Sequence, residues 1–111
     1  MIEKAVLDFL NSKLSVPVYM EVPVDMDDEF VVIEKTGGGQ TDKINSATFA
    51  IQSWATSLLD AAALNKDVLE AMEDAVTLDI IGGCYLNSYY NFTDTDTKRY
   101  RYQAVYNITH Y

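Results

Sequence analysis

Apolar side chains recur every three or four residues in two segments of the chain, which is the spacing of an amphipathic helix. The first segment covers residues 2–13 and precedes Pro17, which cannot continue a helix. The second covers residues 58–76 and follows Ser57, whose spacing from Asp60 is that of a capping box. The sequence therefore predicts two helices, and the second should bury one apolar stripe: Leu58, Ala62, Leu69, Met72 and Val76.

Other apolar and aromatic residues gather in segments with the composition or the alternation of strands. A short segment, 18–22, lies between two prolines, and residues 30–36 are rich in β-branched side chains. Residues 45–54 and 98–109 alternate, and a short polar turn joins the latter to an aromatic segment, 84–92. The last two segments therefore form a predicted hairpin.

The order of these elements is helix, three strands, helix, two strands, which is typical of the α+β class. We expect an antiparallel β-sheet of four to five strands with two helices packed on one face, in a single domain over residues 1–111. The strand side chains that should join the buried stripe of the second helix are Ile33, Phe49 and Ile51.

Three consecutive glycines, Gly37, Gly38 and Gly39, follow the predicted strand at 30–36. Glycine admits backbone conformations that other residues avoid, and it has no side chain to pack. The sequence therefore predicts an extended loop over residues 37–43, without contacts to the core, that becomes ordered only on assembly.

Charge is distributed unevenly along a chain whose net charge is −9. Residues 1–29 hold seven acids against two bases, and residues 60–79 hold six against one, whereas residues 80–93 hold no charged side chain. Most of such a surface repels phosphate backbones and anionic lipids. No segment has the apolar length of a membrane span, and the N-terminus lacks the pattern of a signal peptide. The uncharged and mildly basic C-terminal surface is a candidate to meet an acidic face of another copy.

Two segments invite a ligand-binding interpretation, and both are incomplete. The acidic turn Asp25–Glu29 would need a glycine at the sixth position and a glutamate at the twelfth to form an EF-hand loop, but these positions hold Phe30 and Thr36. The segment Gly37–Lys43 lacks the Gly-Lys-Ser/Thr that opens a helix in a phosphate loop. We therefore predict neither a metal ion nor a cofactor.

Side chains that could carry out catalysis are present, but they do not form a recognisable motif. Cys84, the only cysteine, lies in an apolar strand, and His110, the only histidine, is the penultimate residue. The carboxylates of Glu73 and Asp74 fall on the polar side of the predicted helix. We therefore predict that the protein is not an enzyme, and we assign no catalytic residue.

Tyrosine is concentrated toward the C-terminus, where seven of the eight tyrosines lie at or after residue 85. In the predicted hairpin Tyr100 and Tyr102 share one face, Arg99 and Arg101 share the other, and Tyr89 lies on the preceding strand. Such side chains cover half-buried sheets, form interfaces between proteins, or stack on nucleic-acid bases. The negative net charge disfavours the third interpretation, and the first two stay open.

A strand flanked by prolines, a strand ending in glycines, a strand with tryptophan, a helix and an aromatic hairpin follow one another along almost the whole chain. In this order they resemble the tail terminator (tail completion) proteins of long-tailed phages and prophages of Gram-positive bacteria. No single stretch is diagnostic, and the resemblance lies in their order. The matching stretches are Val16–Pro23, Glu29–Gly39, Ala47–Ala55, Ser88–Phe92 and Lys98–Val105.

The resemblance implies structural work without catalysis. Members of this family form a homo-oligomeric ring, usually a hexamer, that caps the head-proximal end of the tail tube, stops its polymerisation and docks to the neck. The implied partners are other copies of the chain, the tail tube protein and a head–neck connector protein. DNA only passes through the ring, and no membrane is involved. The implied location is the tail–neck junction of a virion made in the cytoplasm of the bacterial host.

Contacts between copies of such a ring would involve the aromatic hairpin and the glycine segment. The arginines of the hairpin would pair with acids of the next subunit, such as Asp25, Asp27 or Asp28. The expected interface residues are Tyr89, Tyr100, Tyr102, Arg99, Arg101, Gly37, Gly38 and Gly39.

Other functions stay open beside the tail terminator. A head–tail adaptor or neck protein would share the small size and the absence of a catalytic motif. A small enzyme with its site at a subunit interface is a further alternative, and a binder of single-stranded nucleic acid is another. The oligomeric state in solution is the observation that would best separate the ring from these alternatives.

Overall fold

The computed structural model describes residues 1–96 and 99–111, and these residues form an α+β fold. The predicted fold class is therefore confirmed. The elements of the described residues, in chain order, are α1 (Ile2–Lys13), β1 (Val18–Tyr19), β2 (Phe30–Thr41), β3 (Ile44–Ala55), α2 (Leu58–Glu73), the 3-10 helix η1 (Ala75–Thr77), β4 (Ile81–Asn91) and β5 (Tyr100–His110).

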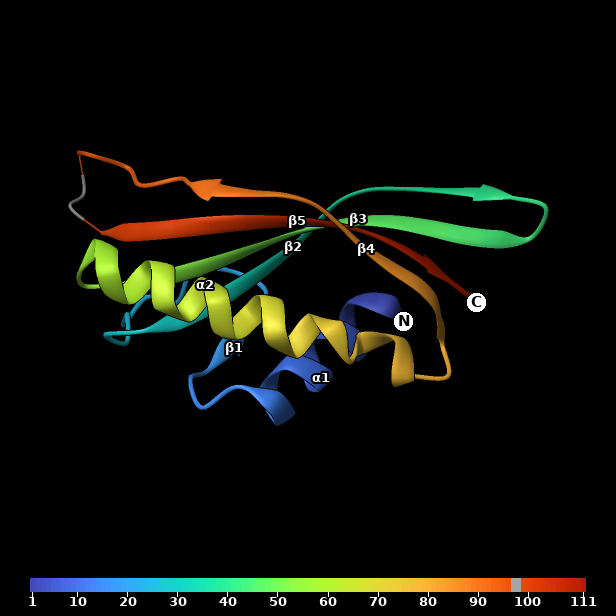
Figure 1. Ribbon diagram of the computed structural model, residues 1–111, viewed down its shortest axis with the longest axis horizontal. Coiled ribbons are helices and arrows are strands. Elements are labelled where there is room, and N and C mark those ends of the chain that lie inside the picture. Colours follow the sequence, from blue (N-terminus) through green and yellow to red (C-terminus); the bar gives the residue numbers. More distant parts are fainter. Residues whose placement is uncertain (97–98) are drawn as a thin grey trace.

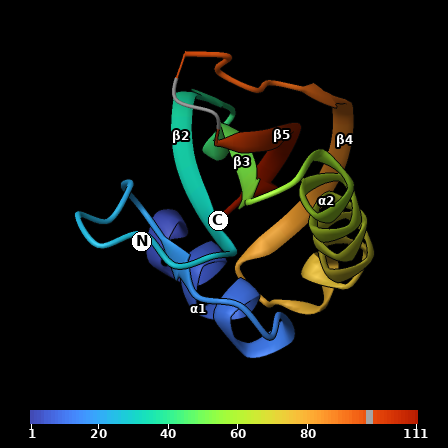
Figure 2. The same ribbon diagram turned by 90° about the vertical axis from the view of Figure 1, so that its left-hand side faces the viewer.

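The strands of the described residues form one five-stranded sheet in the order β1-β2-β3-β5-β4. β1 pairs with β2 in parallel, and the other strand pairs are antiparallel. α1 and α2 lie on the same side of the sheet (Figure 1), and β2 and β4 lie at opposite sides of it (Figure 2). We call the side with the helices the covered face and the opposite side the outer face. Strand register assigns to the outer face Phe30, Val32, Gln52, Trp54, Tyr90, Arg101 and Gln103.

The covered face holds the main hydrophobic core. Ile33, Phe49 and Ile51 are fully buried there, as the sequence predicts. Burying one such side chain is worth about 1.5–3 kcal/mol, so this face supplies most of the hydrophobic stabilisation. The side chains of the helices that pack against it include Val6, Phe9, Leu10, Leu64, Val68 and Met72.

α2 begins where the sequence predicts, because the Ser57 hydroxyl accepts a hydrogen bond from the Asp60 amide at 3.1 Å. It ends at Glu73, three residues earlier than predicted. The chain turns at Asp74 and continues as η1. The capping signal is therefore confirmed at the start of the helix, whereas the end lies where the path toward β4 requires it.

The buried side of α2 differs from the predicted stripe. Met72 is buried, Ala62 and Leu69 are partly buried, and the predicted burial of Leu58 and Val76 is wrong, since they are 41% and 52% exposed. Apolar residues occupy so much of this alanine-rich helix that their spacing alone does not define the centre of the buried side. Val76 also lies beyond the end of the helix. The side that packs on the sheet comprises Ala61, Leu64, Asn65, Val68, Ala71 and Met72.

Gly37, Gly38 and Gly39 lie in β2, where they pair with residues 46–48 of β3. The chain reverses only at Asp42 and Lys43, whose φ angles of 51° and 68° form a two-residue hairpin turn. The predicted loop is therefore wrong, because β3 supplies a partner for the glycines within one chain. Its ordering on assembly stays a prediction. The predicted lack of core contacts is confirmed, since this end of the hairpin is exposed.

The ends of the other strands are shifted from their predicted positions. β4 begins at Ile81, before the predicted residue 84, and so includes two more glycines. The predicted strand 98–109 corresponds to β5, and its first residue, Lys98, lies outside the described residues. The predicted strand 18–22 is reduced to β1, which has two residues.

Candidate functional site

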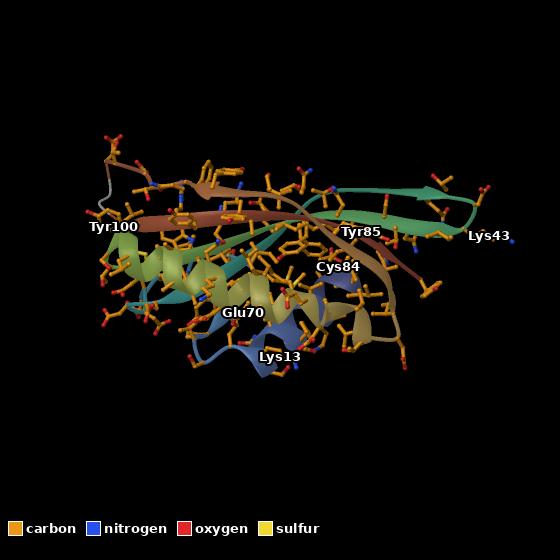
Figure 3. All side chains as sticks on the ribbon, viewed as in Figure 1. Lys13, Lys43, Glu70, Cys84, Tyr85 and Tyr100 are labelled. Atoms are coloured by element: carbon orange, nitrogen blue, oxygen red, sulfur yellow. The ribbon has the colours of Figure 1, made fainter. Side chains whose placement is uncertain are left out.

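β5 directs Arg101 and Tyr102 to opposite faces of the sheet, as predicted. Arg101 lies opposite Trp54 on the outer face, whereas Tyr102 lies opposite Ser53 on the covered face and is partly buried. Tyr100 lies beside the start of α2 (Figure 3) and is also partly buried. Tyr89 is the most accessible of the three expected interface tyrosines, with 54% of its surface exposed.

Arg101 is held by aromatic rings of its own chain. Its guanidinium carbon lies 4.9 Å from the centre of the Trp54 ring and 4.6 Å from that of Phe92. Its Nε atom donates a hydrogen bond of 2.6 Å to the carbonyl oxygen of Phe92. Guanidinium groups prefer such positions on aromatic faces, so Arg101 serves as a cover for the outer face of the sheet.

Arg99 contacts the acidic turn of its own chain. Its guanidinium lies 5.6 Å from the centre of the Phe30 ring and donates a hydrogen bond of 2.9 Å to the carbonyl oxygen of Asp27. From the sequence we expect Arg99 and Arg101 to pair with carboxylates of the next subunit. Within one chain both arginines have intramolecular contacts, and the acidic turn takes part in the Arg99 contact through its main chain. Pairing of the arginines with a neighbouring subunit stays a prediction.

A chain of hydrogen bonds crosses three strands of the outer face. The indole of Trp54 donates to Gln52 at 3.1 Å, Gln52 donates to Gln103 at 3.0 Å, and Gln103 donates to the hydroxyl of Tyr90 at 2.6 Å. These three hydrogen bonds link the four side chains in a row, which holds them in defined positions. With Arg101 over the Trp54 ring, the indole is not open to a stacking base, so this arrangement gives no support to base stacking at Trp54.

β4 carries the largest group of exposed apolar side chains in the hairpin. Tyr85 is 64% exposed, and the same strand and its end expose Leu86, Tyr89, Tyr90 and Phe92. The segment 80–93 around them has no charged residue. Among the described residues, no strand pairs with the side of β4 that faces away from β5. Only Tyr89 of this group is among the interface residues predicted from the sequence, although the absence of charge in residues 80–93 was a signal for the others.

The possible catalytic side chains are not combined into one site. Cys84 lies opposite Ile108, whereas His110 lies opposite Ile81, so the thiol and the imidazole occupy different pairs of the ladder. Burial raises the pKa of the Cys84 thiol to about 11, which keeps it protonated and weakly nucleophilic at neutral pH. Burial, with smaller effects of Cys84 and Glu73, also raises the pKa of the Tyr106 hydroxyl. The groove of about 310 Å³ beside Cys84 is otherwise lined by Leu69, Met72, Glu73, Leu86 and Tyr106.

The acidic turn does not form a metal centre in the described part of the chain. No group of three or more His, Cys, Asp or Glu side chains there could hold a metal ion. Asp27 instead accepts a hydrogen bond of 2.7 Å from the hydroxyl of Tyr19, and this bond raises the pKa of that hydroxyl. The turn therefore uses one of its carboxylates to attach itself to β1.

A second groove, of about 580 Å³, lies between α1 and the segment that follows β1. Its lining is largely apolar, with Glu21 as its acidic side chain. Val24 at its end is fully exposed, and Met20 and Val22 are about half exposed. The groove has no pair of side chains that could act together as acid and base, so its chemistry is that of an apolar contact surface.

A scan against models of known protein families and a search of curated proteins both find no match for the chain. None of the helices in the described residues is both long enough and apolar enough to cross a membrane. The structure alone therefore defines the candidate functional site, which is the exposed, uncharged strand β4 at one edge of the sheet. Beside it lies the outer face, which aromatic rings and guanidinium groups cover.

Proposed function

We propose that the protein is a structural subunit of a phage or prophage tail, and that its copies form a ring that caps the head-proximal end of the tail tube. The observation that carries the proposal is the exposed apolar surface of β4 in an uncharged segment of a chain with a net charge of −9. Contiguous exposed apolar side chains are typical of surfaces that bind other proteins. The resemblance to tail terminators indicates which assembly this surface serves.

The protein would carry out this function through its shape and its contacts with other proteins, without catalysis. The ring, with six copies in the usual case, would stop polymerisation of the tail tube protein by covering its end. Its opposite side would dock to a head–neck connector protein, at the tail–neck junction of the virion. The acidic chain suits a ring through which DNA passes, because a strongly basic lumen would bind phosphates and slow their passage. The subunit would be made in the cytoplasm of the bacterial host, and it needs no cofactor for this role.

Deletion of the gene in its phage tests the proposal. We expect tail tubes of excessive length that do not join heads, as measured by electron microscopy of lysates. Expression of the wild-type chain from a plasmid is the control and should restore normal tails. Tails of normal length that join heads would overturn the proposal. Tails of normal length that fail to join heads would favour the alternative function of a head–tail adaptor.

A further inference from the structure

The sheet has two open edges in the described part of the chain. One edge is β4, which pairs with β5 and with no other strand of the described residues. The other is the distal part of β2, because β1 covers only Val31 and Val32 and leaves Ile33–Thr41 with β3 on one side alone. Residues 85–91 of β4 and residues 34–41 of β2 are exposed. Open strand edges expose main-chain donors and acceptors that can pair with another chain.

The directions of the two edge strands allow one copy of the chain to pair with the next. β2 pairs antiparallel with β3, β3 with β5, and β5 with β4, so β4 runs opposite to β2. When two copies lie side by side in the same orientation, β4 of one copy is therefore antiparallel to β2 of the other. The sheet would continue across the boundary with the same alternation of strand directions.

The two edges also match in charge and in size of their side chains. Ile33–Thr41 contains one acid and one base, Glu34 and Lys35, and β4 has no charged residue. The excess of acids lies elsewhere, in residues 1–29 and 60–79, so contact between the edges brings together the parts of two copies that repel least. β2 contributes three glycines, whereas β4 contributes exposed aromatic rings, and rings on one strand pack well over glycines on a paired strand.

The main chain of β4 has groups that face away from β5. The amide of Phe92 donates to the carbonyl oxygen of Arg101 at 2.8 Å, which directs the Phe92 amide toward β5. By the alternation of an antiparallel strand, the amides of Tyr89 and Asn91 face away from β5. β-Bulges interrupt the ladder near Gly83 and between Leu86 and Ser88, so the regular run of the edge begins at Ser88.

We propose that β4 of one copy pairs antiparallel with Ile33–Thr41 of β2 in a second copy, so that copies join head to tail through a continuous sheet. This contact rests on the proposed function and specifies the interface of the ring. A head-to-tail contact uses two different surfaces, and it closes into a ring when the rotation between copies permits. A two-fold pairing of β4 with β4 would leave the edge of β2 open in each copy.

Mixed cross-linking tests which edges meet. In a Cys84→Ser background, one preparation carries Tyr89→Cys on β4 and the other carries Gly37→Cys on β2, where an added Cβ has no neighbour within 4 Å. With a short bifunctional maleimide at high protein concentration, we expect a cross-linked dimer in the mixture and none in either preparation alone. The matched control replaces Tyr89→Cys by Leu59→Cys on α2 and should give no product. Cross-linking of Tyr89→Cys to itself, or no product in the mixture, would overturn the inference.

Light scattering gives a second, independent measurement. We expect wild-type protein to associate, and Tyr89→Lys to weaken that association at least tenfold because a charge enters an uncharged contact. Leu59→Lys, at a residue that is 79% exposed on α2, should leave association unchanged. Circular dichroism checks that both variants keep the fold. Equal association of Tyr89→Lys and wild type, or a wild-type chain that stays monomeric at millimolar concentration, would contradict the inference.

The two sets of experiments separate the pairing of the sheet edges from the ring function. If deletion of the gene gives overlong tails but the Tyr89→Lys protein still associates, the ring function stands and the pairing of edges is wrong. If the mixed cross-link forms but deletion leaves tails normal, the pairing stands and the chain serves another assembly.

Discussion

The covered face and the outer face of the sheet are stabilised in different ways. The covered face packs α1 and α2 over Ile33, Phe49 and Ile51, and its interactions are those of an ordinary hydrophobic core. The outer face has a much smaller cluster, Phe30, Val32 and Trp54, with Tyr19 packed against it. The rings of Phe30 and Trp54 stack at 5.3 Å between centres.

Side chains from the C-terminal hairpin, and not a helix, cover this smaller cluster. Arg99 and Arg101 lie over its rings, and glutamine side chains link it to β4. Both helices thus pack on one face of the sheet, whereas the other face is covered by single side chains. Among the described residues both edges of the sheet also lack a pairing strand along most of their length, as the proposed assembly requires.

The largest expected effect is the loss of stability when a large buried side chain is truncated to alanine on each face separately. Phe49→Ala should lower the free energy of unfolding by about 3–5 kcal/mol, because it leaves a cavity beneath both helices. Trp54→Ala should cost less, about 3 kcal/mol at the lower end of the same range, since water and the Arg101 side chain can fill part of the space. Urea denaturation measures both. An equal or larger loss for Trp54→Ala would show that the outer face is as important as the core.

A smaller effect is expected from the cation that covers the outer face. Arg101→Ala should lower the free energy of unfolding by about 1 kcal/mol, because it removes contacts with two rings. Arg101→Lys should recover only part of the loss, since an ammonium group lacks the planar stacking surface. Lys43→Ala, at the exposed hairpin turn, is the matched control. If Lys43→Ala costs as much as Arg101→Ala, the effect reflects net charge and not the covering of the rings.

The distal part of β2 lies beyond the cores of both faces, and there a substitution should stabilise the fold. An added Cβ at Gly37 meets no atom within 4 Å, so Gly37→Ala should raise the free energy of unfolding by about 0.5 kcal/mol through the loss of backbone freedom in the unfolded chain. At Gly38 the added Cβ would lie 3.2 Å from Lys35 Cε and 3.3 Å from the carbonyl oxygen of Ser46, so Gly38→Ala should gain less. A gain at Gly38 that exceeds the gain at Gly37 would contradict this expectation.

The smallest expected effect is a change in the reactivity of the Cys84 thiol, which is partly buried on the covered face. The pKa of Cys84 in the folded chain is about 11, compared with 9.0 without burial, so the native protein should react slowly with a thiol reagent at pH 8 and faster as the pH rises toward 11. The folded chain binds the proton of the Cys84 thiol more tightly than the unfolded chain does. The resulting contribution to the free energy of unfolding is therefore fully present below pH 9 and is lost as the pH rises toward 11. The urea-unfolded chain is the control and should reach half of its maximal rate near pH 9, which is the pKa of a thiol that is not buried. Equal rates at pH 8 for both forms would show that the thiol is not sheltered.

Local signals in the sequence were sufficient for much of the fold. The capping pair of Ser57 and Asp60 located the start of α2, and Pro17 lies soon after α1. Alternation along β3 and β5 predicted both the strands and the opposite directions of Arg101 and Tyr102. These features depend on hydrogen bonds and periodicities within a few residues, so they can be read without knowledge of the partner strands.

Features that depend on distant partners were decided only by the tertiary structure. Gly37–Gly39 have no strand propensity of their own, and they are extended because β3 pairs with them. The buried side of α2 is the side that meets the sheet, which leaves Leu58 exposed although it is apolar. Arg99 contacts the ring of Phe30 and donates a hydrogen bond to the carbonyl oxygen of Asp27, which is 72 residues away in the chain. No spacing in the sequence predicts these contacts. The sequence alone thus determined the type of each main element, whereas the tertiary structure decided which surfaces are satisfied within the chain, because long-range pairing and burial outweigh local preference.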